Sequence, residues 1–198
     1  SVAKVVAEKN PADVDVLKAE KLGDVTVDEA LTALIAKIGE NMKIRRFARF
    51  EGNVCSYSHG EGRIGVIVKT EGALNDEAYE AARDVAMQSA AMKAQYLDET
   101  KVPAEVVERE KEIFKQQAIE EGKKPEFLDK IIEGKVKKFY KEICLVDQAF
   151  IKDGDVDVKT YVANNGGEII NCIRYEVGEG MEKRNDNFAE EVMNQVNA

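Results

Sequence analysis

Two regions with closely spaced apolar and β-branched residues give the clearest strand signals in the chain. Residues 54–58 and 63–70 flank a turn that contains Gly60 and Gly62, and residues 168–177 (EIINCIRYEV) have the same character much later. β-Branched residues bounded by glycine favour strands over helices. If these strands share one antiparallel sheet, the helix-rich segment between them is an insertion that folds outside the sheet.

Apolar residues at helical spacing and local capping signals predict helices before the first strands. Residues 2–8 have the pattern of a helix end that stops at Asn10. Thr26 and Glu29 form a capping box, in which the hydroxyl and the carboxylate satisfy free amides at a helix start. We expect this helix to reach about Glu40, with its apolar residues on one side.

Residues 42–51 have a different period from the helix before them. Apolar and polar residues alternate there, which predicts a half-buried strand next to the hairpin. Residues 75–95 then predict a helix with a face of small residues, which allows close packing on a sheet. Further helices are expected at 157–165 and 187–196, the last with an apolar stripe of Phe188, Val192, Met193 and Val196.

The inserted segment predicts two long helices joined by a short link. Pro103 stands at a first-turn position, where its missing N–H does no harm, and Gly122 to Pro125 separate the two helices. Their apolar residues recur at three-, four- and seven-residue spacings, which predicts an antiparallel helical hairpin with arms of roughly 27 Å. The residues expected in its seam include Val107, Phe114, Leu128, Ile132 and Phe139.

Composition narrows the class of function. The 198 residues carry a net charge of −9, which argues against general nucleic-acid binding because such binding depends on Lys and Arg. Cys55, Cys144 and Cys172 are far apart and form no CxxC pair, which fits a reducing cytosol better than a secreted disulfide framework. No apolar run approaches the length of a membrane span. We therefore expect a cytoplasmic protein.

Three short motifs have a functional and a structural interpretation. The string at residues 60–65 (GEGRIG) matches a phosphate-cradling loop, but a strand follows it where that loop needs a helix, so a hairpin turn is the better interpretation. His59 lacks neighbouring metal ligands or a nucleophile signature, which favours a solvated turn residue. Residues 45–50 interleave basic and aromatic side chains as RNA-binding strands do, yet the acidic chain favours a strand with a basic outer face. The sequence predicts no cofactor, no metal site and no catalytic residue.

Four longer strings together resemble one protein family. They are KIGENMKIRRF (37–47), SYSHGEGRIGVIV (56–68), IIEGKVKKFYKEICLVDQAF (131–150) and IRYEVGEGMEK (173–183). They resemble bacterial elongation factor Ts, the guanine-nucleotide exchange factor of elongation factor Tu. The resemblance covers nearly the whole chain in the family's order.

The resemblance implies an α+β fold built from two small subdomains of antiparallel sheet packed with helices. The first subdomain would span residues 1–53, and the second would combine 54–100 with 147–180. The antiparallel helical hairpin, a coiled coil, would occupy 101–146, and a C-terminal helical module would occupy 181–198. This arrangement agrees with the insertion inferred from the strand pattern.

The resemblance also implies that the protein binds elongation factor Tu and promotes GDP release without covalent chemistry. The residues expected to contact that partner are Ile38, Gly39, His59, Phe150, Ile151, Met193 and Val196. The alternative function is a structural dimerisation module, with a homodimer formed through the core or the hairpin.

The chain departs from the family pattern at its start. It begins at Ser1 without Met, inside a segment with a helical pattern. The family's N-terminal three-helix domain and the Thr-Asp-Phe-Val segment that loosens the nucleotide have no counterpart here. We therefore expect a truncated form with weak exchange activity.

Overall fold

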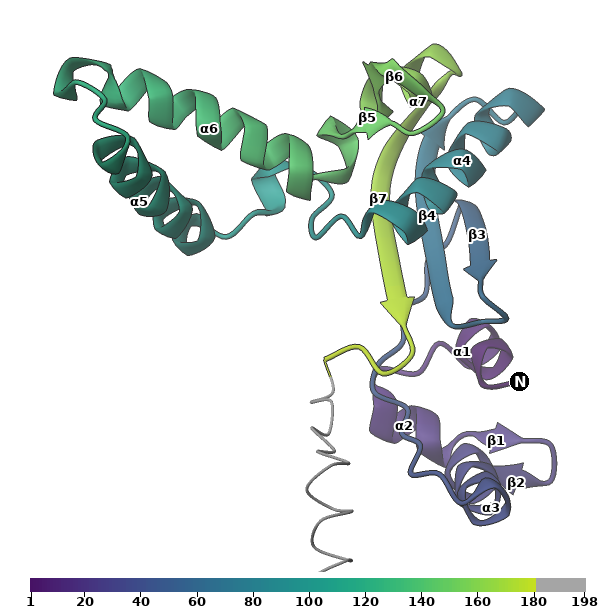
Figure 1. Cartoon of the computed structure of the whole chain (residues 1–198). Coiled ribbons are helices and arrows are strands. Elements are labelled where there is room, and N and C mark those ends of the chain that lie inside the picture. Colours follow the sequence, from purple (N-terminus) through teal and green to yellow (C-terminus); the bar gives the residue numbers. More distant parts are fainter. Residues whose placement is uncertain (181–198) are drawn as a thin grey trace, which may run out of the picture.

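A three-stranded antiparallel sheet organises the computed structural model, which describes residues 1–180 (Figure 1). The sheet contains β3 (Asn53–His59), β4 (Ile64–Gly72) and β7 (Gly167–Glu176), in the order β3-β4-β7. On β4, Val68 lies opposite Cys55 of β3 and opposite Cys172 of β7. The predicted pairing of strands far apart in the sequence is confirmed, as is the α+β class.

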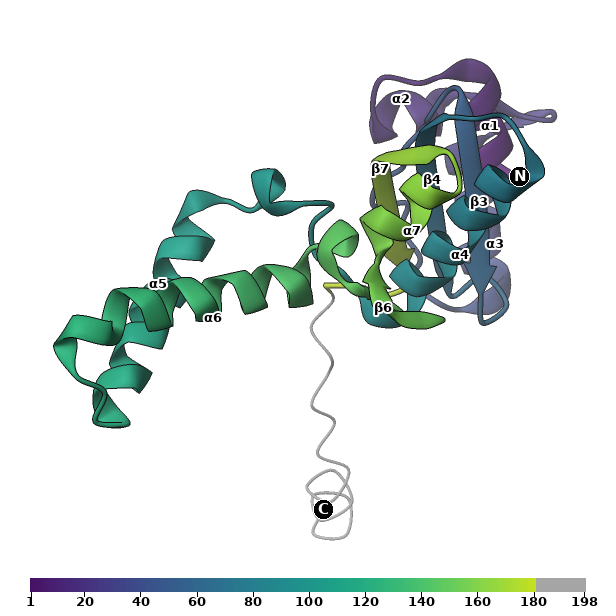
Figure 2. The same cartoon turned by 90° about the horizontal axis from the view of Figure 1, so that it is seen from above.

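Two helices cover one face of this sheet: α4 (Asp76–Met92) and α7 (Val158–Asn164) (Figure 2). Between them and the sheet lies a core of mostly aliphatic side chains: Val66, Val68, Val85, Ala86, Ala90, Leu145, Phe150, Val158, Val162 and Ile169. The face of α4 that meets the sheet carries small residues, so its backbone can approach the strands closely. These buried alanines are Ala78, Ala81, Ala82, Ala86 and Ala90.

The N-terminal part forms a separate helical unit beside one end of the sheet (Figure 1). It contains α1 (Val2–Lys9), α2 (Val14–Ala19), the short pair β1 (Lys21–Leu22) and β2 (Val25–Thr26), and α3 (Val27–Ile38). Its core consists of Val5, Val6, Leu17 and Val27, with Ile44 and Phe47 packed against it.

The capping box predicted at the start of α3 is present. The amide of Glu29 donates to the Thr26 hydroxyl at 3.1 Å, and the amide of Thr26 donates to the Glu29 carboxylate at 2.7 Å. The hydrogen bond that the carboxylate accepts from the Thr26 amide, followed by the one from the Thr26 hydroxyl, lowers the pKa of Glu29. The capping box therefore fixes where α3 begins.

The strand predicted at residues 42–51 is wrong. Residues 39–51 have no regular secondary structure, and no strand of the described chain pairs with them. Alternation describes which side chains are half-buried, whereas a strand also needs a neighbour for its backbone N–H and C=O groups. Ile44 and Phe47 instead pack on the helical unit.

Several short elements were not predicted. The six-residue α2 begins at Asp13, whose carboxylate accepts a hydrogen bond from the amide of Val16 at 2.8 Å. The strands β5 (Ala149–Phe150) and β6 (Asp153–Asp157) pair with a register shift. Elements of this length carry too few residues for a period to be recognised.

The inserted hairpin projects away from the sheet (Figures 1 and 2). Its arms are α5 (Ala104–Glu120) and α6 (Leu128–Ile143), linked by a short 3₁₀ turn at Pro125–Phe127. At its base, Tyr96 pairs with Cys144, and the amide of Leu145 donates to the Tyr96 carbonyl at 2.9 Å. The segment that enters the insertion thus lies beside the segment that leaves it.

Two further sequence predictions concern chain ends and membranes. The helix predicted at 187–196 lies outside the described residues. Among residues 1–180, no helix combines the length and the apolarity that a membrane crossing requires.

Gly72, at the end of β4, should not tolerate a side chain. Its φ is +119°, and a Cβ atom there would lie 2.3 Å from the carbonyl oxygen of Gly166, which belongs to the turn before β7. We expect Gly72→Ala to lower the free energy of unfolding by about 2 kcal/mol or more, because the close backbone approach must open. Urea denaturation measures this change.

Gly65→Ala is the matched control on the same strand. Nothing lies within 4 Å of a Cβ at Gly65, and its φ is outside the left-handed region. We expect no loss of stability, and a gain of about 0.5 kcal/mol is reasonable for a strand interior. Equal losses for the two variants would contradict the close approach at Gly72.

Candidate functional site

The end of α3 presents a large apolar side chain to solvent. Ile38 is 52% exposed, and Leu34, one turn earlier, is 44% exposed. The helix ends at Gly39, whose φ of +81° is a left-handed conformation and whose amide donates to the Ile35 carbonyl. Because glycine adopts this conformation without strain, the C-terminal end of helix α3 is fixed at Gly39. The apolar side predicted for this helix is present, but its last turn is uncovered.

His59 is the last residue of β3 and is exposed. The hydroxyl of Tyr57 lies 3.1 Å from its Nδ1 atom. The turn that follows has positive φ at three consecutive residues, Gly60, Glu61 and Gly62, and leads directly into β4. The hairpin interpretation of GEGRIG is therefore confirmed, and His59 stands at a defined position at the edge of the turn.

Ile151 and Phe150 have opposite environments. Ile151 is 57% exposed, whereas Phe150 is 2% exposed and its ring stacks on Tyr161 at 3.8 Å between centroids. A side chain this deeply buried does not reach a partner, so the expectation of Phe150 as a contact residue does not fit this structure. Phe150 instead anchors the loop that carries Ile151.

Two buried glutamines also hold this loop in place. The side-chain amide of Gln88 on α4 donates to the carbonyl of Ala149 at 3.1 Å, and its oxygen accepts from the amide of Ile151 at 3.0 Å. The side chain of Gln148 donates to the Glu142 carbonyl at 2.9 Å. Gln88 and Gln148 are nearly fully buried. The loop backbone is therefore bonded from inside the core.

Asp84, one turn earlier on α4, provides a second anchor. Its carboxylate accepts from the Lys152 ammonium at 2.6 Å and from the Tyr161 hydroxyl at 2.9 Å. Burial, followed by the hydrogen bond and charge of Asp84, raises the pKa of Tyr161 to about 12. Sequence reasoning missed Asp84 and Gln88; their signal is two polar residues at i and i+4 among the alanines of α4.

The remaining predicted residues fall into two groups. Met193 and Val196 lie outside the described residues. The predicted seam residues are half-buried between the two arms of the hairpin, where Phe114 and Phe139 meet edge to face at 6.3 Å between centroids. These seam residues are Val107, Phe114, Leu128, Ile132 and Phe139, and two of them, Val107 and Phe139, also pack against the cluster of Val102, Ile143 and Cys144 at the base of the hairpin.

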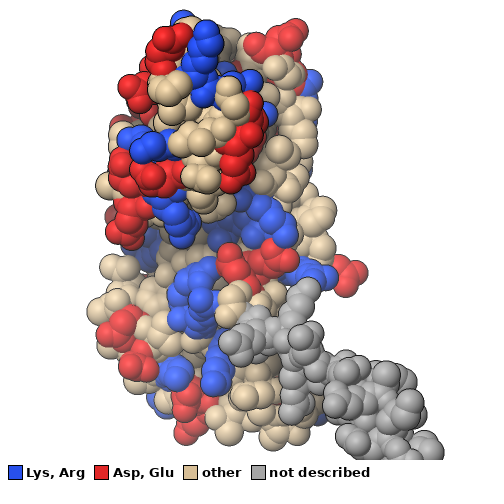
Figure 3. Space-filling view, turned by 60° about the vertical axis from the view of Figure 1, so that its left-hand side comes forward, with Lys and Arg blue, Asp and Glu red and all other residues tan. Residues whose placement is uncertain are grey.

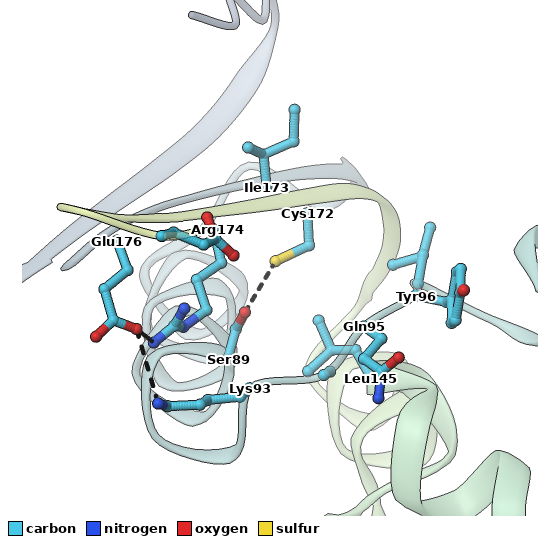
Figure 4. Close-up of a pocket in the computed structure, with 12 residues that line it drawn as sticks. Ser89, Lys93, Gln95, Tyr96, Leu145, Cys172, Ile173, Arg174 and Glu176 are labelled. Atoms are coloured by element: carbon cyan, nitrogen blue, oxygen red, sulfur yellow. Dashed lines mark hydrogen bonds and ion pairs between the residues drawn. The ribbon is translucent and has the colours of Figure 1, made fainter. Parts of the chain in front are cut away.

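A pocket of about 650 Å³ lies between α4 and the free edge of β7 (Figure 4). The Cys172 thiol lies 3.4 Å from the Ser89 hydroxyl, and burial raises the pKa of Cys172. Arg174 and Lys93 both contact the carboxylate of Glu176, at 2.7 and 3.7 Å. Since a protonated thiol is a poor nucleophile and the charged groups pair with one another, this pocket assembles no evident catalytic group. His59 does not line it.

A cluster of carboxylates surrounds the base of the hairpin. Oδ2 of Asp147 is buried and has no hydrogen-bond partner among residues 1–180. Burial, then the nearby carboxylates of Glu99 and Asp157, raise the pKa of Asp147. Within residues 1–180, no three His, Cys, Asp or Glu side chains are grouped so that they could hold a metal ion.

Comparison with known proteins gives a consistent picture along the whole chain. Residues 1–179 match the family model described as Elongation factor TS. The chain is 45% identical over 210 residues to Elongation factor Ts from Clostridium novyi, which covers 100% of this chain and 69% of that protein. It is 48% identical over 202 residues to Elongation factor Ts from Clostridium perfringens, covering 96% of this chain and 67% of that protein. Elongation factor Ts from Symbiobacterium thermophilum is 46% identical over 210 residues, covering 98% and 67%.

Gln88→Leu should loosen the Ile151 loop. The substitution keeps the side-chain size but leaves the Ile151 amide and the Ala149 carbonyl without their partner, which we expect to cost about 1–3 kcal/mol of unfolding free energy. Urea denaturation measures the loss, and hydrogen exchange should be faster at the Ile151 amide. Gln116→Leu, which removes an exposed hydrogen bond to Glu120 on α5, should change stability by only about 0.5 kcal/mol. Equal effects would contradict the anchoring role of Gln88.

Asp147→Asn should stabilise the protein in a pH-dependent way. The folded-state pKa of Asp147 is raised, so its ionisation favours the unfolded state, and the penalty grows as the pH rises above the ordinary value of 3.8. We expect the gain from this substitution to be full at neutral pH and to shrink as the pH falls toward 4. Denaturation at several pH values measures it.

Glu29→Gln is a control with the opposite sign. Hydrogen bonds from Thr26 lower the pKa of Glu29, so its charge stabilises the folded state above the ordinary pKa. This variant should lose stability at neutral pH and approach the unsubstituted protein as the pH falls. A parallel pH dependence of the two variants would contradict the assignment for Asp147.

Proposed function

This chain belongs to the elongation factor Ts family, and we propose that it is a guanine-nucleotide exchange factor for elongation factor Tu. It binds the nucleotide-free form of that GTPase more tightly than the nucleotide-bound form, and it makes or breaks no covalent bond. Because the coupling is reciprocal, the factor weakens nucleotide affinity by the same factor as nucleotide weakens binding of the factor. The proposed site of action is the cytoplasm.

The observation that carries the contact assignment is a set of exposed side chains on rigid supports. Ile38 is fixed by a glycine-capped helix end, His59 by a tight turn, and Ile151 by buried hydrogen bonds from α4. A large apolar side chain whose backbone is already fixed loses little conformational entropy when a partner buries it. We infer that Ile38, Gly39, His59 and Ile151 contact elongation factor Tu.

The supports around these residues take a separate role in this proposal. Phe150, Gln88 and Asp84 position the loop without touching the partner. Burying one isoleucine contributes about 1.5–3 kcal/mol, which corresponds to at least about a tenfold change in affinity. Nucleotide exchange requires more than tight binding. A factor that binds the nucleotide-free and nucleotide-bound GTPase equally tightly does not shift the equilibrium between them. Met193 and Val196 stay predicted contacts.

The alternative function, a dimerisation module, uses different surfaces. The seam residues pack inside one hairpin, so they are not free to join two copies. Ile113, Ile119 and Phe127 are the exposed large apolar side chains on the hairpin, at 42%, 49% and 52%. A homodimer through the hairpin would dock on these residues, whereas one through the core would not involve them. Light scattering of the chain alone reports whether a dimer forms.

We expect this chain to bind elongation factor Tu more weakly in the presence of GDP than in its absence, and to accelerate release of labelled GDP. Ile38→Asp and Ile151→Asp should each weaken binding to the nucleotide-free form at least about tenfold. The reason is that a charge would stand where the complex buries an apolar side chain. Isothermal titration calorimetry and stopped-flow fluorescence measure the two quantities.

Leu74→Asp is the matched control, since Leu74 is 84% exposed and lies in the loop between β4 and α4. It should leave both quantities unchanged. Equal affinity with and without GDP would rule out exchange as the function. Unchanged binding of both isoleucine variants would instead defeat the contact assignment alone.

A further inference from the structure

Two arginines that follow α3 close onto the chain just after β7. Nη2 of Arg46 lies 2.5 Å from the carboxylate of Glu179, and the Arg45 guanidinium donates to the carbonyl of Glu179. The Arg46 guanidinium also lies over the ring of Tyr175, 4.4 Å from its centroid. Arg46 and Glu179 are separated by 133 positions in the sequence, and Arg45 and Glu179 by 134. These contacts therefore tie the N-terminal helical unit to the last strand of the sheet.

Gly180 makes this approach possible. Its φ is +69°, and a Cβ atom there would lie 2.8 Å from Nη1 of Arg45. The guanidinium thus packs directly on the glycine backbone. Gly178, two residues earlier, has a similar φ of +77°, but nothing lies within 4 Å of a Cβ there. Only the second glycine of this turn is in contact with the arginine.

The charges around the contact favour a bound carboxylate. A groove of about 670 Å³ at this place, with Tyr175 in its wall, is lined by four cations and two carboxylates: Lys43, Arg45, Arg46, Arg63, Glu176 and Glu179. Figure 3 shows Lys and Arg side chains gathered in the middle of one face of the described chain. In a chain with a net charge of −9, this is a local concentration of positive charge. Glu179 supplies the carboxylate that Arg46 binds.

We propose that Arg45, Arg46, Tyr175 and Glu179 form a clamp that positions two parts of the binding surface relative to each other. One part is the end of α3 with Ile38 and Gly39, which joins the sheet through residues 39–51, a segment without regular secondary structure. The other is the sheet side, with His59 at the end of β3 and Ile151 in the loop that α4 holds. The inference rests on the proposed function, and the four clamp residues are positioning residues.

The expected effect of the clamp is on binding rather than on folding. Side chains of Arg46 and Glu179 are 39% and 43% exposed, and ion pairs with such exposure contribute little to global stability. Holding two contact regions in their bound arrangement lowers the entropy cost of association. Loss of the clamp should therefore weaken affinity while the unfolding transition stays in place.

The test uses two variants, each with a matched control. Glu179→Gln removes the charge bound by Arg46, and Glu51→Gln removes an equally short ion pair, 2.5 Å, that joins Arg49 to a residue only two positions away. Gly180→Ala displaces the Arg45 guanidinium, and Gly178→Ala places a side chain at the same kind of φ without a neighbour. Calorimetry with nucleotide-free elongation factor Tu should give about a tenfold weaker affinity for Glu179→Gln and Gly180→Ala, with both controls unchanged.

A second readout tests the clamp without the partner. Spin labels are attached to cysteines introduced by Lys37→Cys and Ser58→Cys, and they report the distance between the end of α3 and β3. Cys172→Ser removes the native cysteine that is not fully buried, so that it is not labelled. The clamp predicts a narrow distance distribution that broadens with Glu179→Gln and Gly180→Ala. An unbroadened distribution would overturn the clamp, and unchanged affinity despite broadening would overturn its positioning role. If the unsubstituted chain binds no elongation factor Tu, the proposed function fails, and the spin-label result still decides whether the clamp exists.

Discussion

The pairing of β4 with β7 is the interaction on which the rest of the structure depends. It brings residues 64–72 against 167–176, and everything between them must leave the sheet and return to it. The central strand β4 is bonded on both sides, and its Val66 and Val68 are at the bottom of the core under α4. The same pairing fixes Tyr175 and Glu176, so that the turn after β7 meets Arg45 and Arg46. Without it, neither the hairpin nor the arginine contacts would have a fixed base.

Ile151 and Ile38 are exposed apolar residues whose backbone positions are fixed by other parts of the fold. Ile151 follows directly on the buried Phe150, and its own amide is bonded to a fully buried glutamine. Ile38 ends a helix that begins with a two-sided capping box. Buried polar groups such as Gln88 are costly unless all their bonds are made, and here they are used to set the backbone of a surface loop. At the Ile151 loop, buried side chains therefore determine how an apolar group is presented to solvent.

Much of this fold could be predicted from residue patterns, and the failures have physical reasons. Periodicity and capping located α3, α4, the two hairpin arms and all three strands of the main sheet. The strand expected at 42–51 does not form because alternation reports burial and not the presence of a hydrogen-bonding neighbour. The contact residues came from resemblance, since exposure of Ile38 or burial of Phe150 depends on tertiary packing. Arg46 and Glu179 could not be paired from the sequence at all, because nothing local links them.

The base of the hairpin has a consequence for how this fold can vary. The entering segment at Tyr96 and the leaving segment at Cys144 are bonded to each other before the two helices separate from the sheet. The geometry of the sheet therefore does not depend on the length of the hairpin arms. Turns added to or removed from α5 and α6 in matched numbers would move the tip of the hairpin in space without changing any strand register. The arm is in this sense a module of adjustable reach on a base of constant geometry.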